Sequence, residues 1–175
     1  RFFGHFYSGK IKFLVNDLLM HIKPLAPVFL PINKYGSQAK ESSLQINNAY
    51  ESDEQMLIFP AGLCSRLQHG KIKDLEWKKT FIAKAVQSQR DIIPIYFEGR
   101  NSTFFYRFAQ IRKCIGLKFN IELIYLPDEM FNSKNKTFDI YIGKPIPWQT
   151  FDKSKSLQEW AQIVKEKVYQ IKKNQ

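Results

Sequence analysis

Cysteines and long apolar runs are both scarce in this chain of 175 residues. The two cysteines, Cys64 and Cys114, lie far apart and lack the spacing of a metal site, so the sequence indicates neither a zinc centre nor a disulfide framework. A reducing compartment is the simplest fit to such a chain. No apolar run approaches the ~20 residues that a membrane-spanning helix needs. These absences favour neither a disulfide-stapled fold nor a helix that crosses a membrane.

Residues that commonly carry catalysis are also few. None of the three histidines, His5, His21 and His69, has an evident nucleophilic or acidic partner, so we expect each to be solvated or structural. The sequence lacks a P-loop, a GxGxxG fingerprint, a GxSxG elbow and an HExxH helix. Ser65 has no base near it in the sequence, so it is not predicted to be a nucleophile.

Acidic residues are outnumbered, with 16 Asp and Glu against 27 Lys and Arg, which gives a net charge of +11. This balance points to an anionic partner, which could be nucleic acid, an anionic membrane, a phosphorylated substrate or an acidic carrier protein. Charge alone does not choose among them. The hydrophobic fraction of 44% and the 15 phenylalanines indicate a folded chain, and this length suits one domain.

Short apolar runs alternate with helical patterns along most of the chain. Helices are predicted over 16–22, 37–50, 74–85, 101–115 and 156–171. Asp74 is the expected N-cap of the third helix, Asn101 or Ser102 begins the fourth, and Ser156 and Glu159 form a capping box at the start of the fifth. A basic loop is expected over 69–73. Strands are predicted over 11–15, 28–32, 56–59, 92–97, 120–126 and 138–142. Strand–helix–strand units of these lengths predict right-handed crossovers. We therefore expect an α/β fold in a single domain, with a mostly parallel sheet of about six strands covered by helices.

The stretch from Leu57 to Arg66 is the strongest candidate for a binding site. It begins as an apolar strand, breaks at Pro60 and Gly62, and ends in a hydroxyl and a guanidinium. The carboxyl ends of the strands are where α/β sheets bind ligands, and arginine suits a planar anion such as phosphate or carboxylate. A plain turn with a solvated Arg66 is an equally open interpretation of these residues.

Two other predicted strands are also followed by polar loops, at Asn33-Lys34 and at Glu98–Asn101. In a parallel sheet all three loops would meet at one edge. Lys34, Arg66 and Arg100 are therefore predicted to form a phosphate-binding cluster, although loop residues are often charged for no such reason.

The predicted helix from Phe104 to Lys113 interleaves aromatic residues with positive charge. Such a stripe usually packs in the core, which is what we expect here. An aromatic edge that lies on an anionic bilayer is the alternative.

Four blocks occur in the order in which the glycerolipid (lysophosphatidic acid) acyltransferases carry them. FPAGLCSR at 59–66 resembles the FPEGTRS block of that family, and FLPINK at 29–34 lies at its GxxFIxR block. IIPI at 92–95 resembles its VIPV-like block, and IGKPI at 142–146 resembles its Gly-x-Pro-Ile ending. Within the family, the chain is most similar to the bacterial hemolysin-type branch.

The resemblance implies transfer of a fatty acyl group to a hydroxyl or amine of a lipid or phospholipid precursor. The donor would be an acyl carrier protein or coenzyme A thioester, used as a substrate, with no permanently bound cofactor and no metal. The protein would be cytoplasmic and peripheral on the inner face of the membrane. The residues that the loops and the resemblance together assign to substrate binding are Asn33, Lys34, Phe59, Pro60, Gly62, Ser65, Arg66 and Arg100.

The chain departs from the family pattern in three places. Ala61 stands where the third block has Glu, and Asn33-Lys34 stands where the second block has Arg. The family's HxxxxD motif precedes the first strand, and His5 is followed at that spacing by Lys10, so the motif would lie upstream of Arg1. Residues 1–175 are therefore expected to form an acyltransferase-like domain that lacks its N-terminal catalytic segment and is inactive by itself.

Two alternatives belong to other classes. The first is a lipid- or carrier-binding domain without chemistry, with Ala61 as a sign of lost activity. The second is a basic protein that binds nucleic acid through aromatic stacking. Because the basic residues are dispersed and no nucleic-acid motif is present, we expect no nucleic-acid partner.

Overall fold

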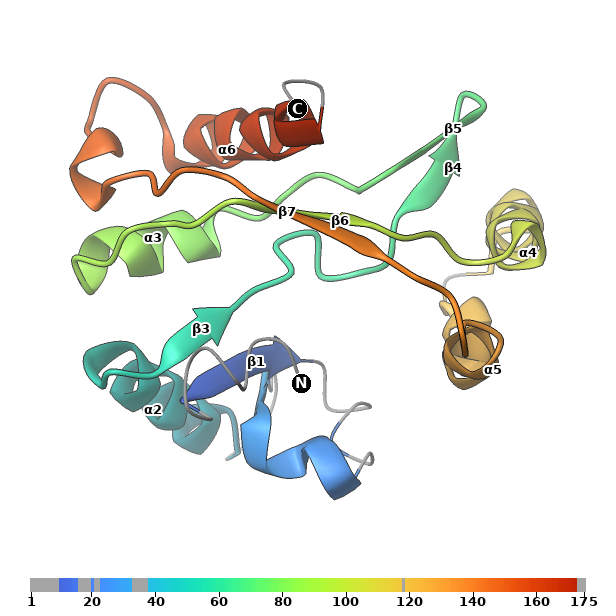
Figure 1. Ribbon diagram of the computed structural model, residues 1–175, viewed down its shortest axis with the longest axis horizontal. Helices are drawn as coiled ribbons and strands as arrows, with labels where there is room; N and C mark the ends of the chain where they lie inside the picture. The colour runs from blue at the N-terminus through green and yellow to red at the C-terminus, as the bar shows by residue number, and fades with distance from the viewer. Residues whose placement is uncertain (1–9, 16–19, 21–22, 33–37, 118, 173–175) are drawn as a thin grey trace.

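The structure is a computed structural model that describes residues 10–15, 20, 23–32, 38–117 and 119–172. Its first sheet is parallel. Its three strands are β1 (Ile11–Val15), β2 (Phe29–Pro31) and β3 (Gln55–Leu57), in the spatial order β2-β1-β3 (Figure 1). Phe13 of β1 pairs with Phe29 on one side and with Leu57 on the other. The first three predicted strands are thus confirmed.

Helical segments link these strands. A 3-10 helix, η2 (Lys23–Val28), leads into β2, and α2 (Gln38–Glu51) leads from β2 towards β3. Ala49 and Tyr50 of α2 are buried, as their spacing predicts. The helix predicted over 16–22 lies almost entirely outside the described residues.

After β3 the chain forms a hairpin of β4 (Arg66–Gln68) and β5 (Lys71–Lys73). His69 and Gly70 at its tip have φ of 48° and 75°, which are the left-handed values that a two-residue hairpin turn requires. A basic loop was expected here. The short strands were missed because lysines, which have low strand propensity, flank the inward Ile72.

The predicted six-stranded, mostly parallel sheet is wrong. β6 (Ile95–Glu98) pairs antiparallel with β7 (Asp139–Ile142) in a separate two-stranded ribbon, and only β1, β2 and β3 are parallel among the described residues. Pro94 lacks an N–H, so the regular ladder begins after it. The alternation of side chains has the same period in parallel and antiparallel pairs, and therefore could not reveal the direction.

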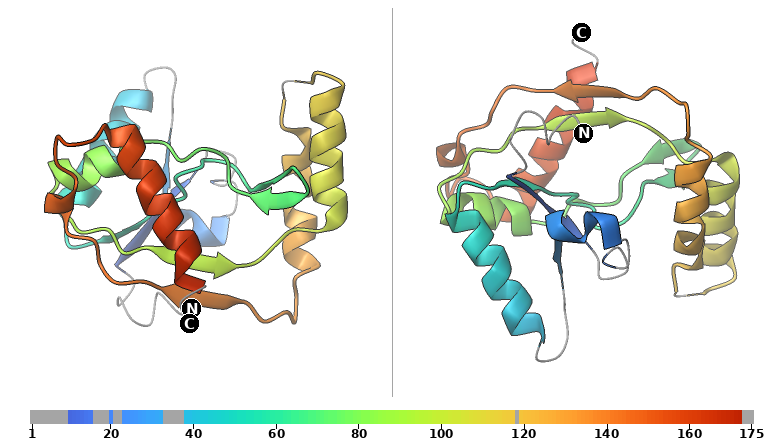
Figure 2. Two further views of the ribbon diagram at one scale, coloured as in Figure 1. Left: turned by 90° about the horizontal axis from the view of Figure 1, so that it is seen from above. Right: turned by 60° about the horizontal axis from the view of Figure 1, so that its bottom comes forward.

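Between β6 and β7 lies a helical unit of α4 (Thr103–Cys114), η3 (Ile121–Tyr125) and α5 (Leu126–Phe131). Ser102 caps α4 by accepting a hydrogen bond from the Phe105 amide, as predicted. The strand predicted over 120–126 is wrong. This segment is η3, which runs into α5, and Pro127 suits the first turn of that helix. Figure 2 shows α4 and α5 side by side at one end of the molecule.

The main core lies between α3 (Thr80–Gln87) and α6 (Leu157–Ile171), which follows the short η4 (Trp148–Thr150). Ser156 and Glu159 form the predicted capping box at the start of α6. α6 lies against the β6–β7 ribbon, on the far side of it from β1 (Figure 1). The buried cluster contains Ala61, Trp77, Phe81, Ile82, Ile146, Phe151, Ala161, Val164 and Val168.

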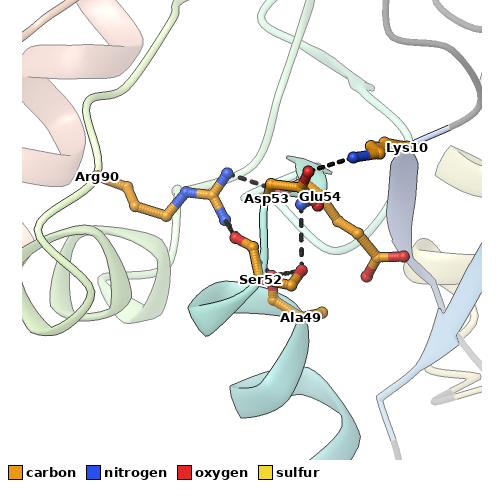
Figure 3. Close-up of polar contacts among 6 residues, drawn as sticks. All are labelled: Lys10, Ala49, Ser52, Asp53, Glu54 and Arg90. Carbon is orange, nitrogen blue, oxygen red and sulfur yellow. Dashed lines mark hydrogen bonds and ion pairs between the residues drawn. The ribbon is translucent and has the colours of Figure 1, made fainter.

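Arg90, just after α3, ties this core to the parallel sheet (Figure 3). Its Nη2 donates to the Glu54 carbonyl at 2.7 Å, and its Nη1 lies 3.3 Å from the Tyr50 carbonyl. Two further carbonyls, those of Ala49 and Ser52, are each 3.4 Å from Nη1. One guanidinium therefore holds the end of α2 and the turn before β3.

Candidate active site

A tight turn at Phe59–Gly62 takes the chain away from β3. The Gly62 amide donates to the Phe59 carbonyl at 2.9 Å, and the Lys78 amide donates to the Pro60 carbonyl at 3.0 Å. Gly62 has φ of +68°, and a Cβ there would be 2.9 Å from Lys78 Nζ. The glycine of the motif is therefore required by the backbone of the turn.

Ala61, which replaces the glutamate of the resembled block, is buried in the main core. A carboxylate at this position would lose its hydration in the core, so alanine suits this packing. The departure from the family pattern therefore coincides with a core position.

The turn, the β6–β7 ribbon and the residues after β6 enclose a cleft of about 1150 Å³. Four of the predicted site residues line it: Phe59, Pro60, Ser65 and Arg100. Gly62 and Arg66 are not among its lining residues, and Asn33 and Lys34 lie outside the described residues. The third block and the end of β6 thus meet, although the sheet that was expected to join them is absent.

Ser65 faces Asp74 across the cleft wall. Its Oγ donates to Asp74 Oδ1 at 2.5 Å, while Asp74 Oδ2 accepts from Trp77 Nε1 at 3.1 Å. Because Ser65 donates its hydroxyl proton to the Asp74 carboxylate, its oxygen can take part in a further hydrogen bond only as an acceptor. Asp74 was predicted to cap a helix, which is wrong, because α3 begins at Thr80 with Lys79 as its N-cap.

Arg66 is turned inward rather than into the cleft. Its Nη2 lies 2.6 Å from Glu122 Oε1, its Nη1 donates to the Cys64 carbonyl at 2.9 Å, and its guanidinium lies 5.7 Å from the centre of the Phe105 ring. The side chain is only 12% exposed. The role of Arg66 as an anion ligand stays a prediction, and in this structure its charge is already balanced by a carboxylate.

Glu122 is fully buried between two arginines. Arg112 Nε lies 2.8 Å from Glu122 Oε2 as an ion pair outside hydrogen-bond geometry, and Arg112 Nη1 donates to the Leu117 carbonyl at 2.6 Å. Sequence reasoning missed Glu122 because it placed this residue on a strand. A glutamate within an otherwise apolar run was the available signal.

Two cations line the cleft and are exposed: Arg100 and Lys136. Neither side chain has an ion pair or a hydrogen bond with another described residue. They are therefore free to meet an anion there. Of the predicted cluster of Lys34, Arg66 and Arg100, Arg100 lines the cleft, Arg66 does not, and Lys34 lies outside the described residues. Lys136 was missed because its polar loop carries no local signal.

Glu98 and Cys64 also line the cleft. Glu98 pairs with Lys172, and the hydrogen bond from that ammonium lowers the pKa of the Glu98 carboxyl. Burial raises the pKa of the Cys64 thiol, which opposes thiolate formation. Glu98 is thus held as a carboxylate, and Cys64 lacks the environment of a cysteine nucleophile.

One His–Asp pair at the HxxxxD spacing was overlooked, namely His69 and Asp74. The exposed His69 lies at the tip of the β4–β5 hairpin, and Asp74 follows the far end of β5. Extended residues advance about 3.3 Å each, so the intervening strand holds the two side chains apart. Asp74 is also engaged by Ser65 and Trp77. The pair therefore does not form a catalytic dyad.

Comparison with known proteins agrees with the order of the motifs. A family model described as acyltransferase matches residues 2–175. The chain is 56% identical to a lyso-glycine lipid O-acyltransferase of Bacteroides thetaiotaomicron over 168 residues, 96% of this chain and 62% of that protein. It is 54% identical to a protein of the same name from Phocaeicola vulgatus, covering 96% of this chain and 60% of that protein. The chain thus spans about three fifths of the length of these curated relatives.

No solved structure matches it significantly. Through the family match over nearly its whole length, this chain belongs to the acyltransferase family.

Proposed function

We propose that this protein moves a fatty acyl group from a thioester to the hydroxyl of a lipid that already carries one acyl chain. The observation that carries the proposal is the cleft in which Phe59, Pro60 and Ser65 of the third block meet the unpaired cation Arg100. The names of the two relatives support a hydroxyl acceptor on a glycine-containing lipid.

The cations of the cleft suit both substrates of such a reaction. A lipid whose glycine is acylated on nitrogen keeps a free carboxylate, and the thioester carriers bear phosphate. Arg100 offers a planar fork for either anion, and Lys136 adds a point charge. The donor on this proposal is an acyl carrier protein or coenzyme A thioester.

The proposed reaction is direct acyl transfer. The acceptor oxygen attacks the thioester carbonyl, the C–S bond breaks, and the proton of the hydroxyl passes through a general base to the leaving thiolate. The base is the histidine of the family's HxxxxD motif, which the resemblance places ahead of β1. Ser65 Oγ, whose own proton is given to Asp74, accepts a hydrogen bond from a donor on the substrate.

We also propose that the protein works at the inner face of the cytoplasmic membrane, where a lipid acceptor meets a cytoplasmic thioester. No helix within the described ranges is long and apolar enough to cross a membrane. The net charge of +11 favours both an anionic surface and an acidic carrier.

A non-catalytic binding domain is the second candidate, and Ala61 in place of the family's glutamate is the observation that favours it. It would use the same cleft and the same cations. The 175-residue chain is expected to bind its lipid without turning it over. Thioester-dependent turnover by this chain alone would contradict that expectation.

The test is acyl transfer from a labelled thioester to a lyso-glycine lipid by a protein that includes the His–Asp motif. Arg100→Ala is expected to raise the KM for the anionic substrate about 10- to 100-fold, because charged hydrogen bonds contribute about 1.5–3 kcal/mol. Lys40→Gln, on the exposed face of α2, is the control for charge. An unchanged KM and kcat in Arg100→Ala would remove the cleft from the proposed site.

A further inference from the structure

The helical unit of α4, η3 and α5 exposes large apolar side chains that no described residue covers. Phe119 is 81% exposed and Ile124 is 73% exposed, both well above what a packed position would show. The apolar face is defined by these exposed residues of the unit: Phe104, Ile111, Ile115, Leu117, Phe119, Ile124, Met130 and Phe131. Monomeric soluble proteins rarely expose so many large apolar side chains on one small unit without a binding role.

α4 is apolar on two opposite faces. Phe105, Tyr106 and Ala109 are buried against the rest of the molecule, as the core prediction requires. Phe104, Ile111 and Ile115 recur at i, i+7 and i+11 on the outer face, where the core prediction is wrong. A surface helix of a soluble protein places polar residues there. The outer face of α4 is therefore built for contact with something apolar.

Aromatic contacts hold this face together. Phe104 and Phe108 stack with 5.7 Å between ring centres, and the edge of Tyr125 from η3 meets them at 5.3 Å and 5.5 Å. η3 is thereby fixed against α4. The apolar face thus belongs to one packed unit rather than to independent loops.

The charge around the apolar face is positive. Asp128 is the one exposed acid among the described residues of 103–136. The exposed cations of the same stretch are Arg107, Lys113, Lys134 and Lys136. Apolar side chains ringed by lysine and arginine match the boundary of an anionic bilayer, where the chains enter the acyl region and the cations meet the headgroups.

The apolar face also leads to the cleft. Phe97 of β6 and Phe138 beside β7 are both exposed, lie 5.3 Å apart between ring centres, and line the cleft. The ends of the β6–β7 ribbon run directly to α4 and α5 (Figure 2). Lys136 belongs both to the cationic ring and to the cleft.

We propose that α4, η3 and α5 form the face with which this protein lies on an anionic bilayer. A lipid could then pass from the bilayer to the cleft beside Phe97 and Phe138 without entering water. This last step rests on the proposed function, whereas binding to the bilayer does not. The two can fail separately.

The test is flotation of the 175-residue chain with vesicles of phosphatidylcholine, with and without phosphatidylglycerol. Ile115→Gln combined with Ile124→Gln is expected to weaken binding to the anionic vesicles more than tenfold, because glutamine lacks the hydrophobic gain that each isoleucine makes on entering the acyl region. Leu44→Gln on α2, where Leu44 is 62% exposed, is the matched control and should bind as the wild type does. Circular dichroism checks that each variant is folded.

The charge part of the proposal has its own variants. Arg107→Gln and Lys134→Gln are each expected to weaken binding about fivefold, and Lys40→Gln should not. Equal binding of the wild type to neutral and anionic vesicles would overturn the proposal. The proposal would also be overturned if the double isoleucine variant bound anionic vesicles as tightly as the wild type does. If that variant bound normally and only its oligomeric mass changed, the apolar face would instead be a contact between copies of the chain. An enzyme that binds vesicles but transfers no acyl group would count against the proposed function alone.

Discussion

Buried charge in this molecule is concentrated at Glu122, which no solvent reaches. Its two oxygens contact Arg66 at 2.6 Å and Arg112 at 2.8 Å, so the three side chains carry a net charge of +1. Two guanidiniums this close together depend on the carboxylate between them. Glu122 is thus a positioning residue for Arg66, which belongs to the third block of the family.

Glu122→Gln is expected to lower the free energy of unfolding by about 3–5 kcal/mol, because it leaves two buried cations without a counter-charge. Urea denaturation measures this loss. Glu54→Gln breaks the Lys12–Glu54 pair, whose side chains are 25% and 29% exposed, and should cost no more than about 1 kcal/mol. Equal losses of unfolding free energy in the two variants would show that the burial of Glu122 does not account for its contribution to stability.

The same contact revises the expectation for Arg66. From the sequence alone, Arg66→Ala lowers acyl transfer and leaves the fold intact. Because the buried Glu122 then keeps only Arg112 as a partner among the described residues, the variant is expected to lose stability as well as activity. A fall in activity at unchanged stability would restore the simpler interpretation of Arg66 as a substrate ligand.

Tyr50 gives a prediction about pH. Burial raises the pKa of Tyr50 to about 12 from an ordinary value of 10.0, and its hydroxyl has no hydrogen-bond partner among the described residues. The folded state therefore favours the neutral phenol. The stability that this contributes is complete below pH 10 and is lost as the pH rises towards 12.

Tyr50→Phe is expected to be more stable than the wild type at pH 7, by about 1 kcal/mol, because a buried unpaired hydroxyl is removed. Its advantage should grow by about 1 kcal/mol at pH 11, where the phenol of the unfolded wild type is ionised and the buried phenol of the folded state is still neutral. Urea denaturation at the two pH values tests this. Tyr125→Phe, with an exposed ring, controls for the hydroxyl. An advantage that does not grow with pH would contradict the assignment.

At the scale of single elements, the ends of helices follow from local sequence. Ser102 caps α4, and Ser156 with Glu159 caps α6, both as predicted, because these hydrogen bonds lie within four residues of one another. Asp74 and the 120–126 segment were predicted wrongly, because both are held by residues far away in the sequence. The Asp74 amide donates to the Tyr169 hydroxyl, and Arg66 donates to the Glu122 carboxylate.

Arg90 shows how one side chain can fix the end of an element. Arg90→Lys is expected to cost about 2 kcal/mol of stability, because a lysine cannot span the carbonyls of Tyr50 and Glu54 with one planar fork. Urea denaturation measures the loss. Arg100→Lys, at an exposed position without a described partner, should change stability by less than about 0.5 kcal/mol. Equal effects would mean that the four carbonyl contacts do not hold α2 against α3.

At the scale of the whole molecule, the core is placed between α3 and α6 rather than on the parallel sheet. Ile82 is completely buried there, so Ile82→Ala is expected to cost about 2–5 kcal/mol. Ile111→Ala, at a position 59% exposed on α4, should cost less than about 0.5 kcal/mol. Thermal or urea unfolding distinguishes them. A large loss in Ile111→Ala would show that the outer face of α4 is covered within the chain.

Several features of this protein were predicted correctly from its amino-acid sequence: the α/β class, the strands β1 to β3, the positions of α2, α4 and α6, and the family. These follow from local periodicity, capping and the order of short blocks, all of which act over a few residues. The sequence also identified Phe59, Pro60, Ser65 and Arg100, which meet in the cleft.

Three features could not be predicted from the sequence and were seen first in the tertiary structure. They are the direction of β6 and β7, the inward turn of Arg66 onto Glu122, and the presence of Lys136 and Asp74 in the cleft. Each depends on residues tens of positions apart, and local pattern does not encode such pairing. The tertiary structure also decided that α4 keeps an apolar outer face, because periodicity shows where apolar residues align but not what covers them.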